Sequence, residues 1–177
     1  MKYVIVSDIH GSKDSANIIK DKFLSQKCDK IILLGDILYH GPRNDLPESY
    51  HPKSVIAILN ELSNNIIAVK GNCDAEVDQM VLNFKILDEY SFVHNNKVIY
   101  CTHGHHVNYL KPTKYEVDYV FHGHTHIIRK DVVNNVTYIN IGSITIPKEN
   151  TAKCYGILEE NLKIYDINDN LLLSINI

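Results

Sequence analysis

The chain has 177 residues and a formal net charge of −3, and these two values already exclude several classes of protein. The length suits one well-buried domain and is short for two, and 45% apolar with 22% charged residues is typical of a globular protein. The charge gives no basic excess for nucleic acid or an anionic membrane, and no apolar run approaches the roughly 20 residues of a membrane span.

Cysteine and histidine content says more about chemistry. The four cysteines lack CxxC spacing, which predicts reduced thiols and a cytoplasmic protein rather than disulfides or a zinc knuckle. The amino terminus also lacks the pattern of a signal peptide. Ten histidines are unusual; five of them fall between His103 and His124, and a sixth is His126.

The first predicted strand, residues 3–6, is followed at once by Asp8 and His10. In an extended backbone, side chains two residues apart point to the same side, so this pair could offer an oxygen and a nitrogen to one cation. A capping aspartate and a surface histidine are the alternative. Apolar residues at helical spacing predict a helix over residues 15–25, which leads the chain to the next strand through a right-handed crossover.

That second strand, residues 31–34, ends in Gly35-Asp36. The carboxylate therefore lies at the carboxyl end of a strand, where open α/β sheets bind their ligands. Three prolines in the following segment predict a loop. Within it, Arg43 is a candidate phosphate contact, with a solvated side chain as the alternative.

A helix over residues 53–62 and a strand over residues 66–69 repeat the pattern, and this strand leads into Gly71-Asn72. The amide oxygen of Asn72 suits a hard cation that carboxylates already bind. A turn asparagine is the alternative reading. A short helix is then predicted over residues 75–82.

Two β-rich runs, residues 86–93 and 97–101, flank Asn95-Asn96 and predict a hairpin. The second run leads into the segment Thr102-His103-Gly104-His105-His106. A further strand, residues 118–121, leads into His122-Gly123-His124-Thr125-His126. Two histidine-rich loops at strand ends favour metal ligation over solvent-exposed histidines.

The last third of the chain shows no helical pattern. Short strands are predicted over residues 127–133, 136–141, 155–159, 162–167 and 171–177, separated by asparagine-rich turns. Strand–helix units followed by an antiparallel meander predict an α/β protein with two packed sheets flanked by helices. No linker or repeat interrupts the sequence, so we expect one domain over residues 1–177.

Five motifs occur in an order that resembles the calcineurin-like metallophosphoesterases, most of all the small bacterial YfcE-type phosphodiesterases. They are Asp8-x-His10, Gly35-Asp36, Gly71-Asn72, His103-Gly104 and Gly123-His124-x-His126. The segments 35–44 and 71–80 share this resemblance, which spans nearly the whole chain. It implies a four-layer α/β-β/α metallophosphoesterase sandwich of two mixed sheets flanked by helices.

The resemblance also implies a centre for two divalent metal ions. Asp8, His10 and His126 would bind one ion, Asn72, His103 and His124 the other, and Asp36 both. Carboxylate, amide and imidazole donors suit Mn²⁺, Fe or Zn²⁺ better than Ca²⁺ or Mg²⁺. We expect Mn²⁺, with Zn²⁺, Fe and Ni²⁺ as alternatives.

The implied activity is that of a metal-dependent phosphodiesterase, or broad phosphoesterase, on small organic phosphate esters. A hydroxide bridging the two ions would attack the phosphorus, with Asp36, Asn72 and His103 as catalytic residues. Many relatives have a histidine, the acid for the leaving group, where this chain has Cys73. That thiol either influences the choice between diesters and monoesters or only packs beside the metals.

Other residues near these motifs have supporting roles in this reading. His105, His106 and His122 would orient the ligands rather than bind metal, and a surface role for His106 is equally open. Gly142-Ser143 resembles the family's Asn-Pro-Gly-Ser turn, with Ile141 in place of the proline.

Two further questions concern partners. The fold also resembles a retromer scaffold subunit, a protein-binding module with a degraded metal site, but every ligand position here holds a competent residue. The charge argues against nucleic acid as substrate. The family resemblance, which implies a cleft without a cap, and the apolar, proline-bearing loop after Asp36 predict a homo-oligomer, a dimer or a tetramer.

Overall fold

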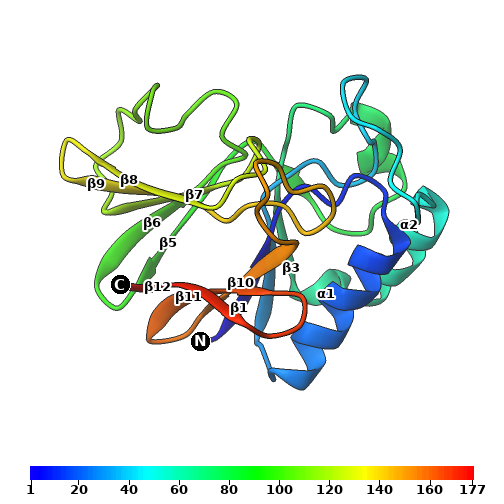
Figure 1. Ribbon diagram of the computed structural model, residues 1–177, viewed down its shortest axis with the longest axis horizontal. Coiled ribbons are helices and arrows are strands. Elements are labelled where there is room, and N and C mark those ends of the chain that lie inside the picture. Colours follow the sequence, from blue (N-terminus) through cyan, green and yellow to red (C-terminus); the bar gives the residue numbers. More distant parts are fainter.

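The computed structural model describes residues 1–177 and consists of two β-sheets with helices on one outer side (Figure 1). The first sheet has seven strands. These are β1 (Tyr3–Val6), β2 (Lys30–Leu33), β3 (Ile66–Val69), β4 (Ile86–Leu87), β10 (Cys154–Leu158), β11 (Asn161–Asp166) and β12 (Leu171–Asn176). Their order is β12-β11-β10-β1-β2-β3-β4; β1 to β4 are parallel, and the remaining pairs are antiparallel.

The second sheet has five strands, in the order β5-β6-β7-β9-β8. They are β5 (Tyr90–His94), β6 (Lys97–Cys101), β7 (Tyr119–His122), β8 (Arg129–Val133) and β9 (Val136–Asn140). β6, β7 and β9 run parallel, whereas β5 and β8 pair antiparallel at the two edges. Both sheets are therefore mixed, as the sequence predicts.

Alternation along β1 shows why the sheets stack as they do. Val4 and Val6 pack with Ala16 and Leu59 of the helices, in a core on one face of the first sheet. Tyr3 and Ile5 belong to the core between the two sheets, together with Ile99, Phe121 and Ile139 of the second sheet. Successive strand residues point to opposite faces, so a strand buried on both faces reads as one continuous apolar run.

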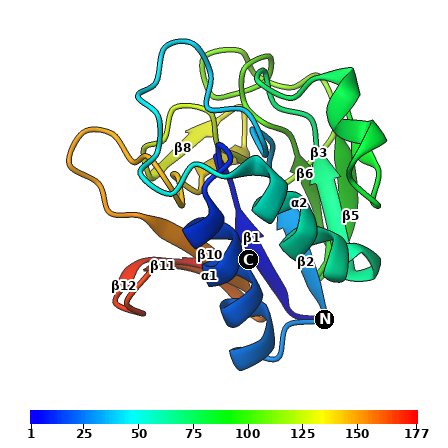
Figure 2. The same ribbon diagram turned by 90° about the vertical axis from the view of Figure 1, so that its right-hand side faces the viewer.

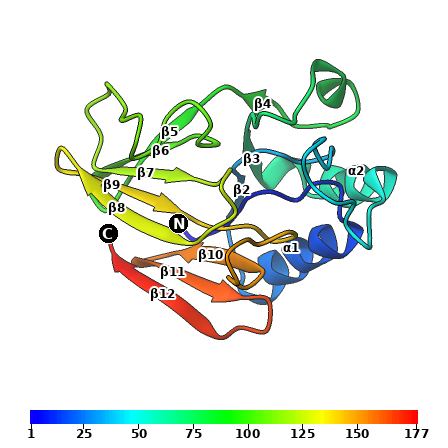
Figure 3. The ribbon, with the colours of Figure 1, turned by 45° about the horizontal axis from the view of Figure 1, so that its top comes forward.

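Both α-helices, α1 (Lys13–Ser25) and α2 (Pro52–Glu61), lie against the first sheet (Figure 3). The Ser12 side chain accepts a hydrogen bond from Ser15 N at the start of α1, and Pro52 begins α2. Two 3₁₀-helices, η1 (Ser63–Asn65) and η2 (Glu76–Met80), complete the helical structure. No helix combines the length and the apolar character required to cross a bilayer.

The structure refines three expectations. The run predicted as one strand over residues 86–93 forms β4 in the first sheet and β5 in the second, because the chain passes between the sheets at Asp88-Glu89. The helix predicted over residues 75–82 is the shorter η2. The predicted flanking helices cover only the first sheet; on the second, Val107, Tyr109 and Val117 of the segment 102–118 pack over Tyr100, Val120 and Tyr138.

Parallel strands place their following loops at one edge of each sheet. Figure 2 shows β1 running upward from the amino terminus, with the loops that follow the parallel strands gathered above it. Backbone hydrogen bonds tie these loops together: Asp8 N donates to Gly35 O, His10 N to Asp36 O, and Gly123 N to His103 O. All five predicted motifs thus meet at one place.

Candidate metal centre

Five of the predicted ligands form a buried cluster at the carboxyl ends of four strands. Asp8 and His10 follow β1, Asp36 follows β2, His103 follows β6 and His126 follows β7. None of the five side chains is more than 3% exposed. Charged and imidazole groups are rarely buried so completely unless they are paired or bind a metal.

The backbone brings these side chains together by tight turns rather than by extended strands. Asp8, His10, His124 and His126 have φ of 60°, 48°, 73° and 64°. The expectation that each pair shares a side through an extended backbone is therefore wrong, since β1 ends at Val6 and β7 at His122. Four non-glycine residues at positive φ mark a strained segment, and such strain concentrates at functional sites.

Two glycines allow the loops to approach closely. A Cβ at Gly71 would lie 2.1 Å from Asp36 Oδ1, and a Cβ at Gly35 would lie 2.6 Å from Gly71 N. Gly35 also has a φ of 93°, which side chains rarely adopt. The glycine before Asp36 and the one before Asn72 are thus required by the close packing of these two loops.

Asp8, His10 and His126 have their donor atoms in one group. Asp8 Oδ1 lies 3.3 Å from His126 Nε2 and 3.6 Å from His10 Nε2. The two Nε2 atoms are 3.4 Å apart. The predicted ligands of the first ion are therefore within 4.8 Å of one another.

Asp36 lies between this group and the predicted ligands of the second ion. Its Oδ2 is 3.7 Å from His10 Nε2 and 3.3 Å from His103 Nε2. The same His103 nitrogen is 3.1 Å from Asn72 Oδ1. His124 is less central: its ring centroid is 5.1 Å from that of His103, and its backbone N donates to Asp8 Oδ2.

The orientation of three imidazole rings is fixed by backbone carbonyls. Nδ1 of His10 lies 2.9 Å from Tyr39 O, that of His103 lies 2.6 Å from Leu34 O, and that of His126 lies 2.8 Å from Ile146 O. Because a carbonyl oxygen can only accept, each Nδ1 must carry the ring proton. In the neutral rings each Nε2 therefore presents a lone pair to the cluster, the arrangement typical of metal-binding histidines.

The buried carboxylates of Asp8 and Asp36 make the cluster negatively charged, and this charge favours the binding of cations. Burial alone would raise the pKa of Asp8, but the neighbouring His10 and His126 lower it. Burial likewise disfavours charged His103, yet the carboxylates of Asp36 and Asp8 raise its pKa to about 9. Asp8 Oδ1 is buried and accepts no hydrogen bond. Facing lone pairs and an unsatisfied carboxylate oxygen fit divalent cations bound by these donors.

Cys73 lies at the edge of the cluster. Its sulfur is grouped with the donor atoms of His10 and Asp36, and its backbone N donates to Asp36 Oδ1 over 2.8 Å. Burial and the charge of Asp36 raise the pKa of the thiol to about 12. In the protein without metal, Cys73 is therefore a neutral thiol at physiological pH.

Three further histidines, His105, His106 and His122, lie around the cluster. The His105 ring lies 5.5 Å from the His103 ring and 6.0 Å from the His124 ring. His106 packs on His105 at 3.9 Å. His122 Nδ1 lies 3.2 Å from Gly123 O, beside the turn to His124. These contacts suit residues that orient the cluster, as the sequence predicts, but no contact tests that role directly.

The structure also identifies a supporting residue that sequence reasoning missed, Asp74, and shows what Ser143 of the predicted turn contacts. The buried Asp74 carboxylate accepts hydrogen bonds from the backbone N of Asp36, Ile37 and Gly71, which fixes the two loops to each other. Ser143 Oγ donates to Asp8 O over 3.1 Å. Asp74 follows Asn72 by two residues, and only its position next to the Gly71-Asn72 motif signals a role.

A small pocket opens from the cluster to the surface. Its volume is about 50 Å³, and its walls include Asp36, Asn72 and Cys73, with Arg43 and Lys148 as the cationic side chains. Arg43 was a candidate from sequence, whereas nothing in the sequence around Lys148 indicated that it would line this pocket. Two cations at the mouth of a metal-competent pocket favour an anionic ligand.

Comparison with known proteins shows which proteins this chain resembles. The family model for the calcineurin-like phosphoesterase superfamily domain matches residues 1–163. The chain is 37% identical to "Phosphodiesterase YfcE" of Escherichia coli strain K12, over 98% of this chain and 96% of the relative. The solved structure of the E. coli Yfce phosphoesterase superposes with a TM-score of 0.95 at 34% identity and covers all of both chains.

A more distant structural neighbour has a different name. Vps29 of Entamoeba histolytica, solved in complex with Zn²⁺, superposes with a TM-score of 0.60 at 18% identity and covers 99% of both chains. At that identity the likeness concerns the fold alone.

Proposed function

This chain belongs to the calcineurin-like phosphoesterase superfamily, and we propose that it hydrolyses small organic phosphodiesters with two bound divalent metal ions. One observation carries the proposal: the buried carboxylate of Asp36 and three fixed imidazoles surround Asp8 Oδ1, which is buried and has no hydrogen-bond partner. The cluster opens into a pocket whose wall carries Arg43 and Lys148. A buried anionic centre beneath a cationic mouth suits a phosphate ester bound through metal ions.

In this proposal Asp8, His10 and His126 hold one ion, and Asn72, His103 and His124 hold the other. Asp36 would contribute to both ions, which its position between His10 and His103 supports. When bound, two such ions lower the pKa of a water molecule and neutralise charge on a phosphoryl group, which favours in-line displacement. The mixed oxygen and nitrogen donors support Mn²⁺, with Zn²⁺, Fe or Ni²⁺ as alternatives.

The side chains around the ions bind and orient the ester. Arg43 can donate two parallel hydrogen bonds to phosphoryl oxygens, and Lys148 adds a second positive charge from another loop. The Cys73 thiol, whose pKa in the metal-free protein is raised by burial and by Asp36, cannot carry the positive charge of an imidazolium. A singly charged diester is therefore matched better than a dianionic monoester.

The remaining features of the proposal concern the protein's surroundings. Four free cysteines support a cytoplasmic location. A homo-oligomer, a dimer or tetramer, is supported by Leu46, which is 59% exposed in the loop after Asp36. Light scattering at micromolar concentration tests this assembly, and a monomer there contradicts it.

The alternative of a protein-binding scaffold on the same fold has less support. The Vps29 likeness is at 18% identity, against 37% for the E. coli phosphodiesterase. The cluster also keeps a competent donor at every predicted ligand position. A scaffold needs no buried, strained carboxylates, which cost stability unless they serve a site.

Metal dependence is the direct test of the function. Protein stripped with EDTA should not hydrolyse bis(4-nitrophenyl) phosphate, and Mn²⁺ should restore turnover. Asp8→Asn should lower turnover strongly and reduce the bound Mn²⁺, measured by elemental analysis, by about one ion per chain. Asp118→Asn is the matched control, because Asp118 pairs with Lys97 on the surface. Turnover that survives chelation, or a metal-loaded wild type without turnover, would overturn the proposal.

A further inference from the structure

We propose that an apolar groove beside the metal centre binds one ester arm of the substrate, and that this arm is a neutral aromatic or hydrocarbon group. This inference rests on the proposed function. The groove has a volume of about 360 Å³. Its apolar wall is formed by Leu38, Tyr39, Tyr50, Ile56, Val77 and Val81.

The groove adjoins the phosphoryl pocket at one residue, Cys73, that lines both. The phosphoryl pocket holds only about 50 Å³, far below the roughly 300 Å³ at which small-molecule sites begin. It can accept a phosphoryl group but not the alcohols esterified to it, so both arms extend beyond it, and the groove is the adjoining cavity that can receive one of them.

The loops that form the metal centre also build the groove. Tyr39 lies in the groove wall while its carbonyl accepts the Nδ1 proton of His10. The Tyr50 ring packs against Gly11, where an added Cβ would lie 2.5 Å from the ring. The His40 ring lies between the two tyrosines, 4.7 Å from Tyr39 and 5.4 Å from Tyr50. A bound arm would therefore lie at a fixed place relative to the ligands.

The chemistry of the groove selects a neutral arm. Its one carboxylate, Asp78, is buried and accepts a hydrogen bond from Ala75 N, and no lysine or arginine lines it. A second phosphate or other anion would find no positive charge there, because both cations line the phosphoryl pocket. Tyr39, Val77 and Val81 remain 42%, 59% and 41% exposed, so an apolar arm would remove their side chains from water.

Two monoanions that cannot be hydrolysed allow binding in the groove to be measured independently of catalysis. Diphenylphosphinate and dimethylphosphinate carry the same phosphoryl charge and have no leaving group, so they differ only in their arms. Calorimetry on Mn²⁺-loaded protein should give diphenylphosphinate an affinity at least about tenfold higher, as expected when roughly 60 Å² of apolar surface is covered. Equal affinities with intact diester turnover would overturn the groove and leave the function in place.

Substitutions test whether the higher affinity for the phenyl compound arises in the groove. Val77→Asp should reduce the phenyl advantage to about one, because it places a charge in the path of the ring. Val132→Asp is the matched control: Val132 is 63% exposed on β8, and the phenyl advantage should persist there. An advantage that survives Val77→Asp would overturn the proposal. Circular dichroism and melting confirm that each variant is folded.

Two independent readouts complete the test. Phenol should shift the NMR methyl resonances of Val77 and Val81 in metal-free protein, and an absence of shifts counts against the groove. If light scattering shows that Val77→Asp dissociates an oligomer while the phenyl advantage is unchanged, a second copy occupies the groove and the proposal is wrong. Failure of the wild type to hydrolyse any diester with Mn²⁺ instead rejects the function.

Discussion

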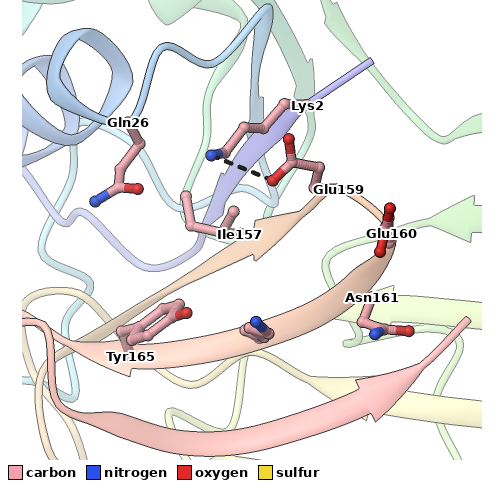
Figure 4. Close-up of a pocket in the computed structure, with 8 residues that line it drawn as sticks. Lys2, Gln26, Ile157, Glu159, Glu160, Asn161 and Tyr165 are labelled. Atoms are coloured by element: carbon pink, nitrogen blue, oxygen red, sulfur yellow. Dashed lines mark ion pairs between the residues drawn. The ribbon is translucent and has the colours of Figure 1, made fainter.

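The two ends of the parallel strands in the first sheet differ in cavity size and in how far their charged side chains are buried. The amino end has a cavity of about 360 Å³, and the carboxyl end has the pocket of about 50 Å³. Figure 4 shows Lys2, Glu159 and Asn161 around the larger cavity. There Lys2 Nζ pairs with Glu159 Oε2 at 3.4 Å, and the glutamate side chain is 62% exposed.

At the carboxyl end the charged groups are buried instead of exposed, and the pocket is smaller. Asp8 and Asp36 are buried beside three imidazoles, and one carboxylate oxygen has no hydrogen-bond partner. Exposed ion pairs are satisfied by water and contribute little, whereas buried charges cost several kcal/mol unless something compensates them. The buried, uncompensated charge therefore identifies the site, and the size of the cavity does not.

The largest predicted effect comes from the residue between the two ligand groups. Asp36→Ala should lower kcat/KM by at least about 10³-fold, because several kcal/mol of metal-dependent stabilisation are lost. His126→Ala removes a ligand of only one ion, so it should lose less and recover in part as Mn²⁺ is raised. Steady-state kinetics with parallel metal analysis measure both. Near-normal turnover of Asp36→Ala at saturating Mn²⁺ would show that the bridging assignment is wrong.

Cys73 offers a smaller effect, in selectivity rather than in rate alone. Cys73→His introduces a group that can carry a positive charge and protonate a leaving oxygen, whereas a thiol carries no positive charge in either of its protonation states. We expect the kcat/KM ratio of aryl monoester to aryl diester to rise by roughly 10²-fold, the lower end of the range for general acid catalysis. The comparison requires equal metal occupancy. If the ratio does not change and activity is intact, Cys73 serves packing alone.

The charges of the carboxyl end should also control the stability of the metal-free protein. The pKa of His103 is raised to about 9, above the ordinary value of about 6.5. Its contribution is complete below pH 6.5 and is lost as pH rises through 9. Denaturation in EDTA should therefore show a falling unfolding free energy over that interval, and bound Mn²⁺ should reduce the fall. A flat profile for wild type, or the same slope in His103→Gln, would contradict this.

Much of the fold follows from sequence because local patterns and long-range packing agree there. Asn95-Asn96 and Asn134-Asn135 have positive φ at both positions and form the predicted hairpin turns. The run 86–93 was misjudged because a strand pattern does not indicate its partner. Ile86 pairs with Ala68 in one sheet and Tyr90 with Cys101 in the other, a choice that depends on tertiary contacts.

The candidate site was predictable in its chemistry and less so in its geometry. Metal-competent residues at strand ends are visible in the sequence, because parallel strands place those ends together. The positive φ of Asp8 and His10 was not visible, since non-glycine residues adopt it only where surrounding contacts require it. The same holds for Asp74 and Lys148, whose contacts come from loops distant in the sequence.

The smallest predicted effect lies at the amino end of the strands. Lys2→Met removes the ion pair with Glu159 but keeps the backbone bonds in which Lys2 O accepts from Asp29 N and Lys30 N. The unfolding free energy should change by no more than about 0.5 kcal/mol, because an exposed pair gains little in water. Turnover should be unaffected, since this cavity shares no residue with the metal centre. A double-mutant cycle with Glu159→Gln measures the coupling, and the same variants report kcat/KM. A tenfold loss of activity in Lys2→Met would mean that the larger cavity takes part in catalysis, and that buried charge alone does not identify the site.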